Sequence, residues 1–378
     1  FVASVYAHLL AFHLPYMKAL EEWGYRVIAV ASDRCYMNGK DELIGLGFQC
    51  IDVPFERSPI RKSNASAYKD LRTMFASKDD IKLVHVHTAT AAFITRIAAA
   101  AAHSNAAMLY TSHGFYFHEG SKAKDWLMYY WPEKYAARQT DGLITINHED
   151  YEVAKKFAVR PGGRVYYVPG VGVDLSLYMP GSHDDRCEIR ARLGAGPEDV
   201  VFIYVAEVNR NKNQRQFLTA FRDMCHSTKV PARAWIVGDG PLKPDMQALA
   251  YDMRIDSRVS FLGFRRDVPA LLRGADVAVL LSYREGLPRC LMEACATGLP
   301  VIATNTRGNR DIVDNEVNGI LVQPDDVEAT TNALCTLAMD DRIRRSMANQ
   351  GREKIQSFGI DKVMPLMSEI YRSWLDER

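Results

Sequence analysis

The sequence has few cysteines, no long apolar run and almost no net charge. Its seven cysteines are odd in number and contain no Cys-x-x-Cys pair, which predicts reduced thiols, a cytoplasmic setting and no zinc site. No stretch reaches the roughly 18 apolar residues that cross a membrane. The formal net charge of +1 indicates no nucleic-acid partner, because nucleic-acid-binding domains tend to be strongly basic. The cysteines are Cys35, Cys50, Cys187, Cys225, Cys290, Cys295 and Cys335.

The sequence also lacks an initiator methionine and a visible signal peptide. Because residues Phe1 to Val5 already have the pattern of a strand, we expect a few native residues to precede them. The turn that follows, Ala7-His8-Leu9, lacks the Gly-x-Gly-x-x-Gly pattern that brings backbone amides to a pyrophosphate. This absence argues against a dinucleotide-dependent dehydrogenase.

What the sequence does have is a regular alternation of short apolar runs with stretches of helical period. This alternation is typical of parallel sheets covered by helices. The apolar runs of the first half are residues 1–5, 27–31, 83–87, 108–111, 143–146 and 165–168. Those of the second half are residues 200–205, 234–237, 259–262, 277–281, 301–303 and 320–322.

A length of 378 residues predicts two domains. We expect an α/β fold of two doubly wound, Rossmann-like domains, residues 1–180 and 181–357, joined by a polar stretch near residues 179–185. Residues 358–378 should form an amphipathic helix that packs back across the domain boundary, or that merely closes the second domain. Open α/β sheets bind ligands beyond the carboxyl ends of their strands, so the cleft between the two sheets is the predicted active site.

Two acids, Glu285 and Glu293, flank the point where an expected strand turns into a helix. Glu285 follows the apolar run, and Pro288 suits a first helical turn, where its missing N–H costs nothing. Both carboxylates can face one crevice beside the unpaired amides of the helix start, which attract anions such as phosphate. The pattern predicts a sugar-nucleotide site. The alternative is a capped surface helix with acidic residues in its first turn.

Two cations, Arg210 and Lys212, follow the first strand of the second domain. A diphosphate leaving group gains negative charge as its bond to sugar breaks, so cations aimed at it stabilise the transition state. Their alternative role is that of solvated surface charges. The next two strand ends carry Gly238-Asp239-Gly240-Pro241 and Gly263-Phe264, which allow close backbone approach to a ligand but are also ordinary turn sequences.

Histidines stand out in the first domain. His113 follows an expected strand, with Gly114 freeing the backbone beside it, so its side chain would face the cleft; a structural role is the alternative. His85 and His87 alternate with valines and therefore share one strand face. A metal site would need further ligands that the sequence does not identify, which favours a structural role for this pair.

Taken together, these strand-end loops resemble the retaining family-four glycosyltransferases of the GT-B fold. The motifs that carry the resemblance are Ser282-Tyr283-Arg284-Glu285-Gly286-Leu287-Pro288 running to Glu293, the Arg210/Lys212 loop, Val237-Gly238-Asp239-Gly240-Pro241, Phe261-Leu262-Gly263-Phe264 and His113-Gly114. Three further segments are similar to a subgroup that makes bacterial capsular and exopolysaccharides: Phe12-His13-Leu14-Pro15, residues 111–117 and residues 168–174.

The resemblance implies a role for each site residue. Glu293 would bind the nucleotide ribose and Glu285 the hydroxyls of the transferred sugar, while Arg210 and Lys212 would hold the diphosphate. His113 would reach the sugar from the opposite domain, and Phe264 would lie by the base. The catalytic set is thus Glu285, Lys212, Arg210 and His113, and the donor-binding set is Glu293, Gly286, Leu287, Pro288, Arg289, Phe264, Gly238 and Gly114.

Two positions depart from the family pattern. Glu207 stands where the family often has an arginine, so we expect Arg210 to supply that charge. The glycine-rich first loop of many relatives is replaced here by residues 7–13, which makes His8 and His13 candidates for the acceptor side.

The resemblance also implies a reaction. A sugar, hexosyl or N-acetylhexosaminyl, would move with retention of configuration from a UDP-sugar to a saccharide or polyprenyl-diphosphate-linked saccharide in bacterial surface polysaccharide synthesis. No cofactor or metal is expected, because the cations can neutralise the diphosphate and no Asp-x-Asp pair follows a strand. A UDP-sugar epimerase of the same fold and a non-catalytic sugar-binding protein are the alternatives.

Cations with interleaved aromatics suggest contact with an anionic membrane, at the inner face of the plasma membrane. A lipid-linked acceptor would make such contact useful. Acids such as Asp70, Asp79 and Asp80 dilute the first patch, so a solvated helix face is the alternative. The cations are Arg57, Arg61, Lys62, Lys69, Arg72, Lys78 and Lys82, and a second patch runs from Lys122 and Lys124 through Trp126 to Tyr129, Tyr130 and Trp131.

Overall fold

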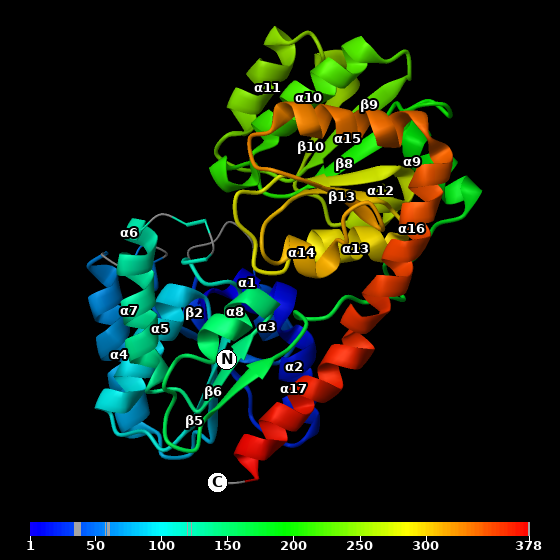
Figure 1. Cartoon of the computed structure of the whole chain (residues 1–378). Coiled ribbons are helices and arrows are strands. Elements are labelled where there is room, and N and C mark those ends of the chain that lie inside the picture. Colours follow the sequence, from blue (N-terminus) through cyan, green and yellow to red (C-terminus); the bar gives the residue numbers. More distant parts are fainter. Residues whose placement is uncertain (34–38, 57, 59–60, 119, 122, 377–378) are drawn as a thin grey trace. The chain divides into compact units, whose positions relative to one another are not determined.

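The computed structural model describes residues 1–33, 39–56, 58, 61–118, 120–121 and 123–376. Cys35, Arg57 and Lys122, named above, lie outside these residues. The chain forms two compact units: Phe1–Val171 with Lys362–Arg378, and Gly172–Asp361 (Figure 1).

The first unit contains a parallel seven-stranded sheet in the order β3-β2-β1-β4-β5-β6-β7. Its strands are β1 (Val2–Val5), β2 (Ile28–Ser32), β3 (Gln49–Asp52), β4 (Leu83–His87), β5 (Ala107–Ser112), β6 (Gly142–Thr145) and β7 (Arg164–Tyr167). Its helices are α1 (Tyr6–Phe12), α2 (Leu14–Glu22), α3 (Gly39–Gly45), α4 (Ser63–Ser77), α5 (Ala89–Ala101), α6 (Ala123–Asp125), the π-helix η1 (Trp126–Tyr130), α7 (Trp131–Ala137) and α8 (His148–Ala154).

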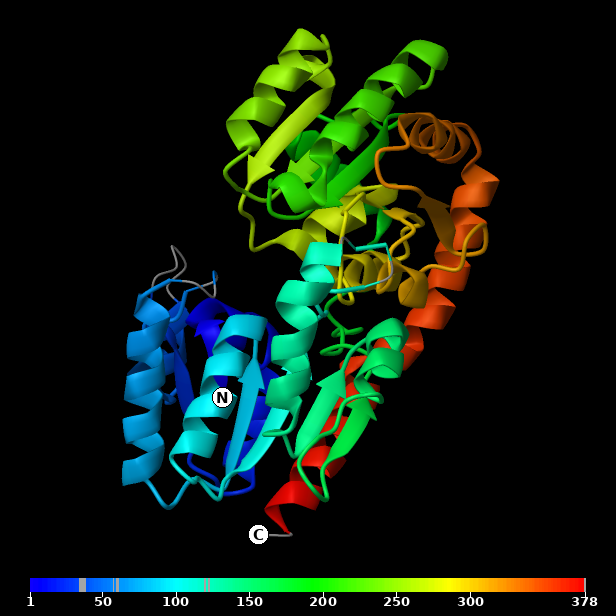
Figure 2. The same cartoon turned by 60° about the vertical axis from the view of Figure 1, so that its left-hand side comes forward.

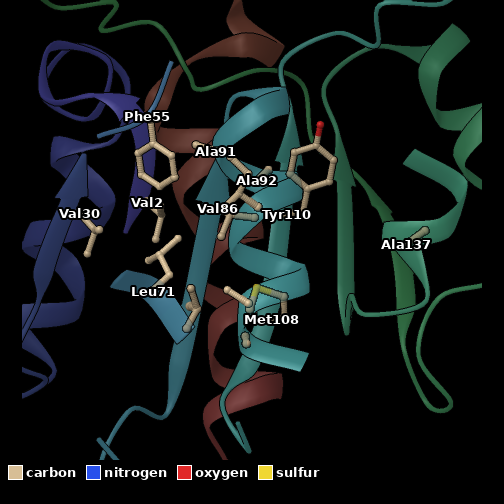
Figure 3. Close-up of a cluster of buried hydrophobic side chains, with 14 of the residues drawn as sticks. Val2, Val30, Phe55, Leu71, Val86, Ala91, Ala92, Met108, Tyr110 and Ala137 are labelled. Atoms are coloured by element: carbon tan, nitrogen blue, oxygen red, sulfur yellow. The ribbon is translucent and has the colours of Figure 1, made fainter. Parts of the chain in front are cut away.

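The two faces of this sheet are covered differently. On one face, apolar side chains such as Val86 and Met108 pack against Leu71 of α4 and Ala91 of α5 (Figure 3). On the other face, His85 Nδ1 lies 2.8 Å from the hydroxyl of Tyr371 on α17 (Ile360–Leu375). Figure 2 shows α4 and α5 in front of the strands and α17 behind them. The expected alternation along β4 is therefore confirmed.

The second unit contains a parallel six-stranded sheet in the order β10-β9-β8-β11-β12-β13. Its strands are β8 (Val200–Val205), β9 (Ala232–Val237), β10 (Val259–Gly263), β11 (Val277–Leu280), β12 (Val301–Thr304) and β13 (Gly319–Val322). Its helices are α9 (His183–Arg192), η2 (Arg210–Lys212), α10 (Gln214–Ser227), α11 (Lys243–Asp252), η3 (Asp256–Arg258), α12 (Val268–Gly274), α13 (Arg289–Thr297), α14 (Asn309–Ile312), α15 (Val327–Met339), α16 (Asp341–Ile355) and η4 (Gln356–Phe358).

The strand that sequence reasoning missed is β3. It pairs with β2 at the edge of the first sheet, and both its end residues, Gln49 and Asp52, are exposed. An edge strand of four residues buries too little apolar surface to show a clear apolar run. The other twelve expected strands are present within a few residues of their expected bounds.

The boundary between the units falls at Val171/Gly172 and not near residue 180. Val173 explains the difference: its N–H donates to Phe358 O (3.0 Å), and its carbonyl accepts from the N–H of Ile360 (2.9 Å). Residues from Gly172 onward are thereby tied to the end of the second unit. From Lys362 the chain returns to the first unit, where Trp374 Nε1 donates to the Tyr166 hydroxyl (3.1 Å).

Candidate active site

The order of strands in the second unit defines where a ligand can bind. The strands after β8 are added first on one side of it, as β9 and β10, and then on the other side, from β11 onward. The parallel neighbours β8 and β11 therefore mark the point where the order of the strands reverses. Doubly wound sheets bind ligands at such a switch point, beyond the carboxyl ends of the strands. The loop after β8 carries Arg210 and Lys212, and the loop after β11 carries Glu285. The predicted loops therefore flank the switch point.

An ion pair joins the two loops. Lys212 Nζ lies 2.5 Å from Glu285 Oε1, and the two side chains are 20% and 11% exposed. Burial alone would lower the pKa of Lys212, but Glu285 and, more weakly, Cys290 and Glu207 raise it overall. The ammonium is therefore charged at neutral pH and largely shielded from water.

The loop after β8 is held in place by polar contacts on both sides of Lys212. The side chain of Asn209 accepts the N–H of Lys212 (3.1 Å). The buried hydroxyl of Tyr204 donates to the carbonyl of Lys212 and accepts the N–H of Leu281 (2.7 Å). Asn211 adds a second link, because its carbonyl accepts the N–H of Tyr283 (2.8 Å). The two loops are therefore bonded to each other on both sides of the ion pair.

The loop after β12 completes this arrangement, and sequence reasoning missed it. Arg307, which is buried, donates from Nε to the carbonyl of Glu285 (2.9 Å). A Cβ on the next residue, Gly308, would lie 1.9 Å from the carbonyl oxygen of Gly286. Only glycine permits this approach. A signal was available: an Arg-Gly pair shortly after an apolar strand belongs to the same carboxyl edge.

Glu293 lies on α13, as expected, and is 7% exposed. Its carboxylate pairs with Arg289 Nε at 2.7 Å and hydrogen-bonds the hydroxyl of Tyr178. Burial raises its pKa, and the contacts with Arg289 and Tyr178 offset only part of that effect. Tyr178 was not predicted, because the segment before the expected linker has no periodic pattern.

Cys290 shows that the two acids belong to one region. Cys290 is half-buried, and burial is the main reason that the pKa of its thiol rises to about 12. Lys212 lowers that pKa, whereas Glu285 and Glu293 both raise it, so all three charges lie within electrostatic range of the thiol. The fold thus gathers the charges that the sequence placed in three separate loops and helices.

The remaining donor-side candidates differ in exposure. Pro288 is the N-cap of α13 and not part of its first turn, and it is buried together with Leu287. Arg210 is exposed in η2, and Phe264 is 55% exposed after β10. Gly238 makes a close approach: its N–H donates to Gly263 O (2.7 Å), and a Cβ there would lie 2.0 Å from Ala206 O. The ends of β8, β9 and β10 are therefore packed backbone to backbone.

The candidates of the first unit also come together. The ring centroids of His8 and His113 are 4.8 Å apart, and those of His13 lie 5.3 and 5.2 Å from them. Gly114, beside His113, has φ +120°, which favours glycine. The role of His113 toward a sugar held by the other unit stays a prediction.

Within the part of the chain that the structure describes, no helix is long and apolar enough to cross a membrane.

Comparison with known proteins identifies the family. Residues 185–354 match the family described as glycosyl transferases group 1, and residues 14–170 match the glycosyl transferase 4-like domain. A protein named as a glycosyltransferase, EpsD of Bacillus subtilis (strain 168), is 34% identical over 378 residues, which is 100% of this chain and 96% of the relative. The UDP-Gal:alpha-D-GlcNAc-diphosphoundecaprenol alpha-1,3-galactosyltransferase of Escherichia coli is 32% identical over 316 residues, 82% of this chain and 81% of that protein.

Solved structures show the same fold. HepE of Anabaena, in complex with UDP-glucose, superposes with a TM-score of 0.77 at 19% identity and covers 98% of this chain and 99% of its own. Sucrose-phosphate synthase of Thermosynechococcus elongatus gives a TM-score of 0.80 at 19% identity, with 100% of this chain and 99% of that one covered. The two Rossmann-like units are those of the GT-B fold, and the chain belongs to the group 1 glycosyltransferases, as the resemblance implied.

Proposed function

We propose that this enzyme transfers a sugar from a UDP-sugar to a saccharide or polyprenyl-diphosphate-linked saccharide in the synthesis of a bacterial surface polysaccharide. The observation that carries the proposal is the shielded Lys212–Glu285 pair at the switch point of the second sheet, with buried Glu293 nearby. The names of the relatives support the substrate classes, since one acts on a lipid-linked acceptor with a UDP-sugar.

Each charge has a task in this reaction. Lys212 and the exposed Arg210 stabilise the diphosphate as it leaves, because the attraction between cation and phosphate grows as negative charge develops. The attraction is larger for Lys212, which is shielded from water. Glu285 accepts hydrogen bonds from hydroxyls of the transferred sugar, and Glu293 from the ribose. Glu285 also keeps Lys212 in place before the donor arrives, since the pair is already formed in the free enzyme.

The other predicted residues surround these charges. The backbone of the loop that enters α13 contacts the donor phosphate and sugar. This loop consists of Gly286, Leu287, Pro288 and Arg289. Phe264 offers an exposed ring to the base. His113 binds the sugar, and His8 and His13 serve the acceptor side.

The reaction retains configuration at the anomeric carbon. The acceptor hydroxyl attacks from the face that the diphosphate leaves, and the departing phosphate oxygen takes the hydroxyl proton. The enzyme contributes positioning and charge stabilisation. Transfer requires no divalent cation, because Lys212 and Arg210 neutralise the leaving group.

We also propose peripheral contact with the inner face of the plasma membrane. The segment of η1 and α7 exposes Leu127, Met128, Trp131 and Tyr135. The ammonium of Lys134 lies 5.3 Å from the Trp131 ring centroid, so a cation accompanies the apolar side chains. This combination suits an anionic lipid surface.

The test is a transfer assay with a panel of UDP-sugars and polyprenyl-diphosphate-linked acceptors, in the presence of EDTA. We expect UDP release that depends on the acceptor, and a product whose anomeric configuration by NMR matches that of the donor. Conversion of a UDP-sugar without acceptor would show an epimerase instead. Binding of saccharide without binding of UDP, measured by calorimetry, would show a sugar-binding protein.

A further inference from the structure

Half of the histidines of this chain gather in one place. In five of its ten histidines, the ring centroid lies within 4.8 Å of the centroid of another histidine in the group. The five are His8, His13, His85, His87 and His113. His8 and His13 lie after β1, His85 and His87 in β4, and His113 after β5. In the first sheet, the order of the strands reverses between the parallel neighbours β1 and β4, so the cluster occupies the switch point of this unit.

Three of these imidazoles have the spacing of metal ligands. One ring nitrogen from each of His8, His13 and His113 can be chosen so that all three lie within 4.8 Å of one another. A tetrahedral zinc ion with Zn–N bonds of about 2.0–2.1 Å places the centroids of two ligating rings about 5 Å apart. The three centroid distances here are 4.8, 5.2 and 5.3 Å. Small side-chain rotations would close the set on one ion.

Several ring nitrogens of the cluster lack a hydrogen-bond partner. Among the described residues, His8 Nε2, both ring nitrogens of His13 and His87 Nε2 are buried without a hydrogen bond. Buried polar atoms are rarely left in this state, because each one forgoes its hydration without compensation. The unpartnered nitrogens of His8 and His13 are the atoms with which an imidazole binds a metal ion.

The other two histidines support the three. His87 Nδ1 lies 3.4 Å from His113 Nε2, and His85 is fixed by Thr111 (2.7 Å) and Tyr371 (2.8 Å). Ligating histidines in metal sites are oriented by such outer contacts. From the sequence, no metal was expected because cations can neutralise the diphosphate and no Asp-x-Asp pair follows a strand, and no further ligands were found for His85 and His87. Folding brings residues 8, 13 and 113 together.

We propose that His8, His13 and His113 form a site for a divalent transition metal of the zinc class. Three protein ligands leave a fourth position open to water or another oxygen ligand. Because the proposed function assigns the same three side chains to the sugar and the acceptor, bound Zn²⁺ competes with substrate and inhibits transfer. This last clause rests on the proposed function, whereas binding of the metal does not.

The test is titration of untagged, EDTA-dialysed protein with Zn²⁺ by calorimetry, and with Co²⁺ by its tetrahedral absorption bands. We expect one ion per chain, with affinity at least about 10–100-fold weaker in His8→Gln and in His113→Gln. His226→Gln is the matched control, because His226 is exposed on α10 of the other unit. Thermal melts without metal establish that each variant is folded, and His8 and His113 are chosen because neither is fully buried.

Absence of stoichiometric binding to the wild type, or equal affinity in His8→Gln and His226→Gln, would overturn the site. Glu293→Ala should bind Zn²⁺ like the wild type even though it lacks the proposed ribose contact. A protein that binds Zn²⁺ but transfers no sugar would therefore contradict the proposed function and leave the metal site standing. Zn²⁺ binding without inhibition of an active enzyme would contradict only the competition.

Discussion

Lys212 Nζ and Glu285 Oε1 lie 2.5 Å apart and join the loops that follow β8 and β11. Both side chains are mostly withdrawn from water, so each depends on the other for its charge to be tolerated. In the proposed reaction, the donor diphosphate would offer Lys212 a second anionic partner. The ion pair thus positions the Lys212 ammonium before the donor binds.

Replacing Lys212 with Met should lower turnover by about 100-fold, the usual effect of removing one group that stabilises developing negative charge. Donor affinity should fall much less, because the proposed contact of Arg210 with the diphosphate would remain. Steady-state kinetics with the preferred UDP-sugar, together with calorimetry for UDP, measure the two effects. Lys229→Met is the control, since Lys229 is exposed on the same unit. Unchanged turnover in Lys212→Met would remove Lys212 from the catalytic set.

Replacing Glu293 with Gln should weaken UDP binding, because an amide offers the ribose hydroxyls one acceptor oxygen in place of two. The same change should stabilise the fold at neutral pH. Burial raises the pKa of Glu293 above its ordinary 4.5, so the folded state binds the proton more tightly than the unfolded state does. Stability of the wild type is therefore lost as the pH rises from 4.5 through the raised pKa, and the neutral amide escapes this loss.

Thermal melts of the wild type and Glu293→Gln over a pH series check this prediction. The melting temperature of the variant should exceed that of the wild type at pH 7.5, by about 2–4 °C for each kcal/mol gained. The difference should shrink as the pH falls toward 4.5. A variant that is less stable at pH 7.5 would show that the ion pair with Arg289 outweighs the burial of the carboxylate.

The sequence predicted the local parts of this site well and its tertiary parts poorly. Glu285 and Glu293 could be placed because an apolar strand, a proline and a helical pattern lie within one continuous segment. Arg307 follows the apolar strand β12, so its place at this edge was open to prediction but its contact with Glu285 was not. Tyr178 and the three-imidazole cluster could not be placed, because their contacts join segments far apart in the chain. Of the thirteen strands in the part of the chain that the structure describes, twelve carried an apolar run, whereas β3 lies at an edge with its end residues in water.

Gly308→Ala should disturb the donor site without touching any charge. A Cβ at this position would meet backbone atoms of Gly286 and Leu287, the nearest at 1.9 Å, so one of the two loops has to move. We expect a loss of about 1–3 kcal/mol in the free energy of unfolding, typical of forced overpacking. UDP affinity should fall as well, since the displaced loop carries Glu285.

Chemical denaturation and UDP calorimetry measure both effects of Gly308→Ala. Gly196→Ala is the matched control, because a Cβ there would meet only Asp199, at an ordinary 3.5 Å. If the two variants behave alike, the close approach of the two loops has no energetic weight.

Exposed apolar side chains on η1 and α7 should anchor the protein to anionic membranes. Leu127 and Trp131 are 71% and 58% exposed, four residues apart on adjoining helical turns. Burying side chains of this size in lipid contributes about 1.5–3 kcal/mol each, so Leu127→Ser with Trp131→Ser should weaken vesicle binding at least about 10-fold. Flotation with vesicles containing anionic lipid measures the loss. The control is Tyr251→Ser, since Tyr251 is equally exposed on the second unit.

Because the cations near this segment act only on anionic lipid, raising the salt concentration should weaken wild-type binding, whereas neutral vesicles should bind weakly at any salt concentration. Equal flotation of the wild type and the double variant would mean that these side chains serve some other contact.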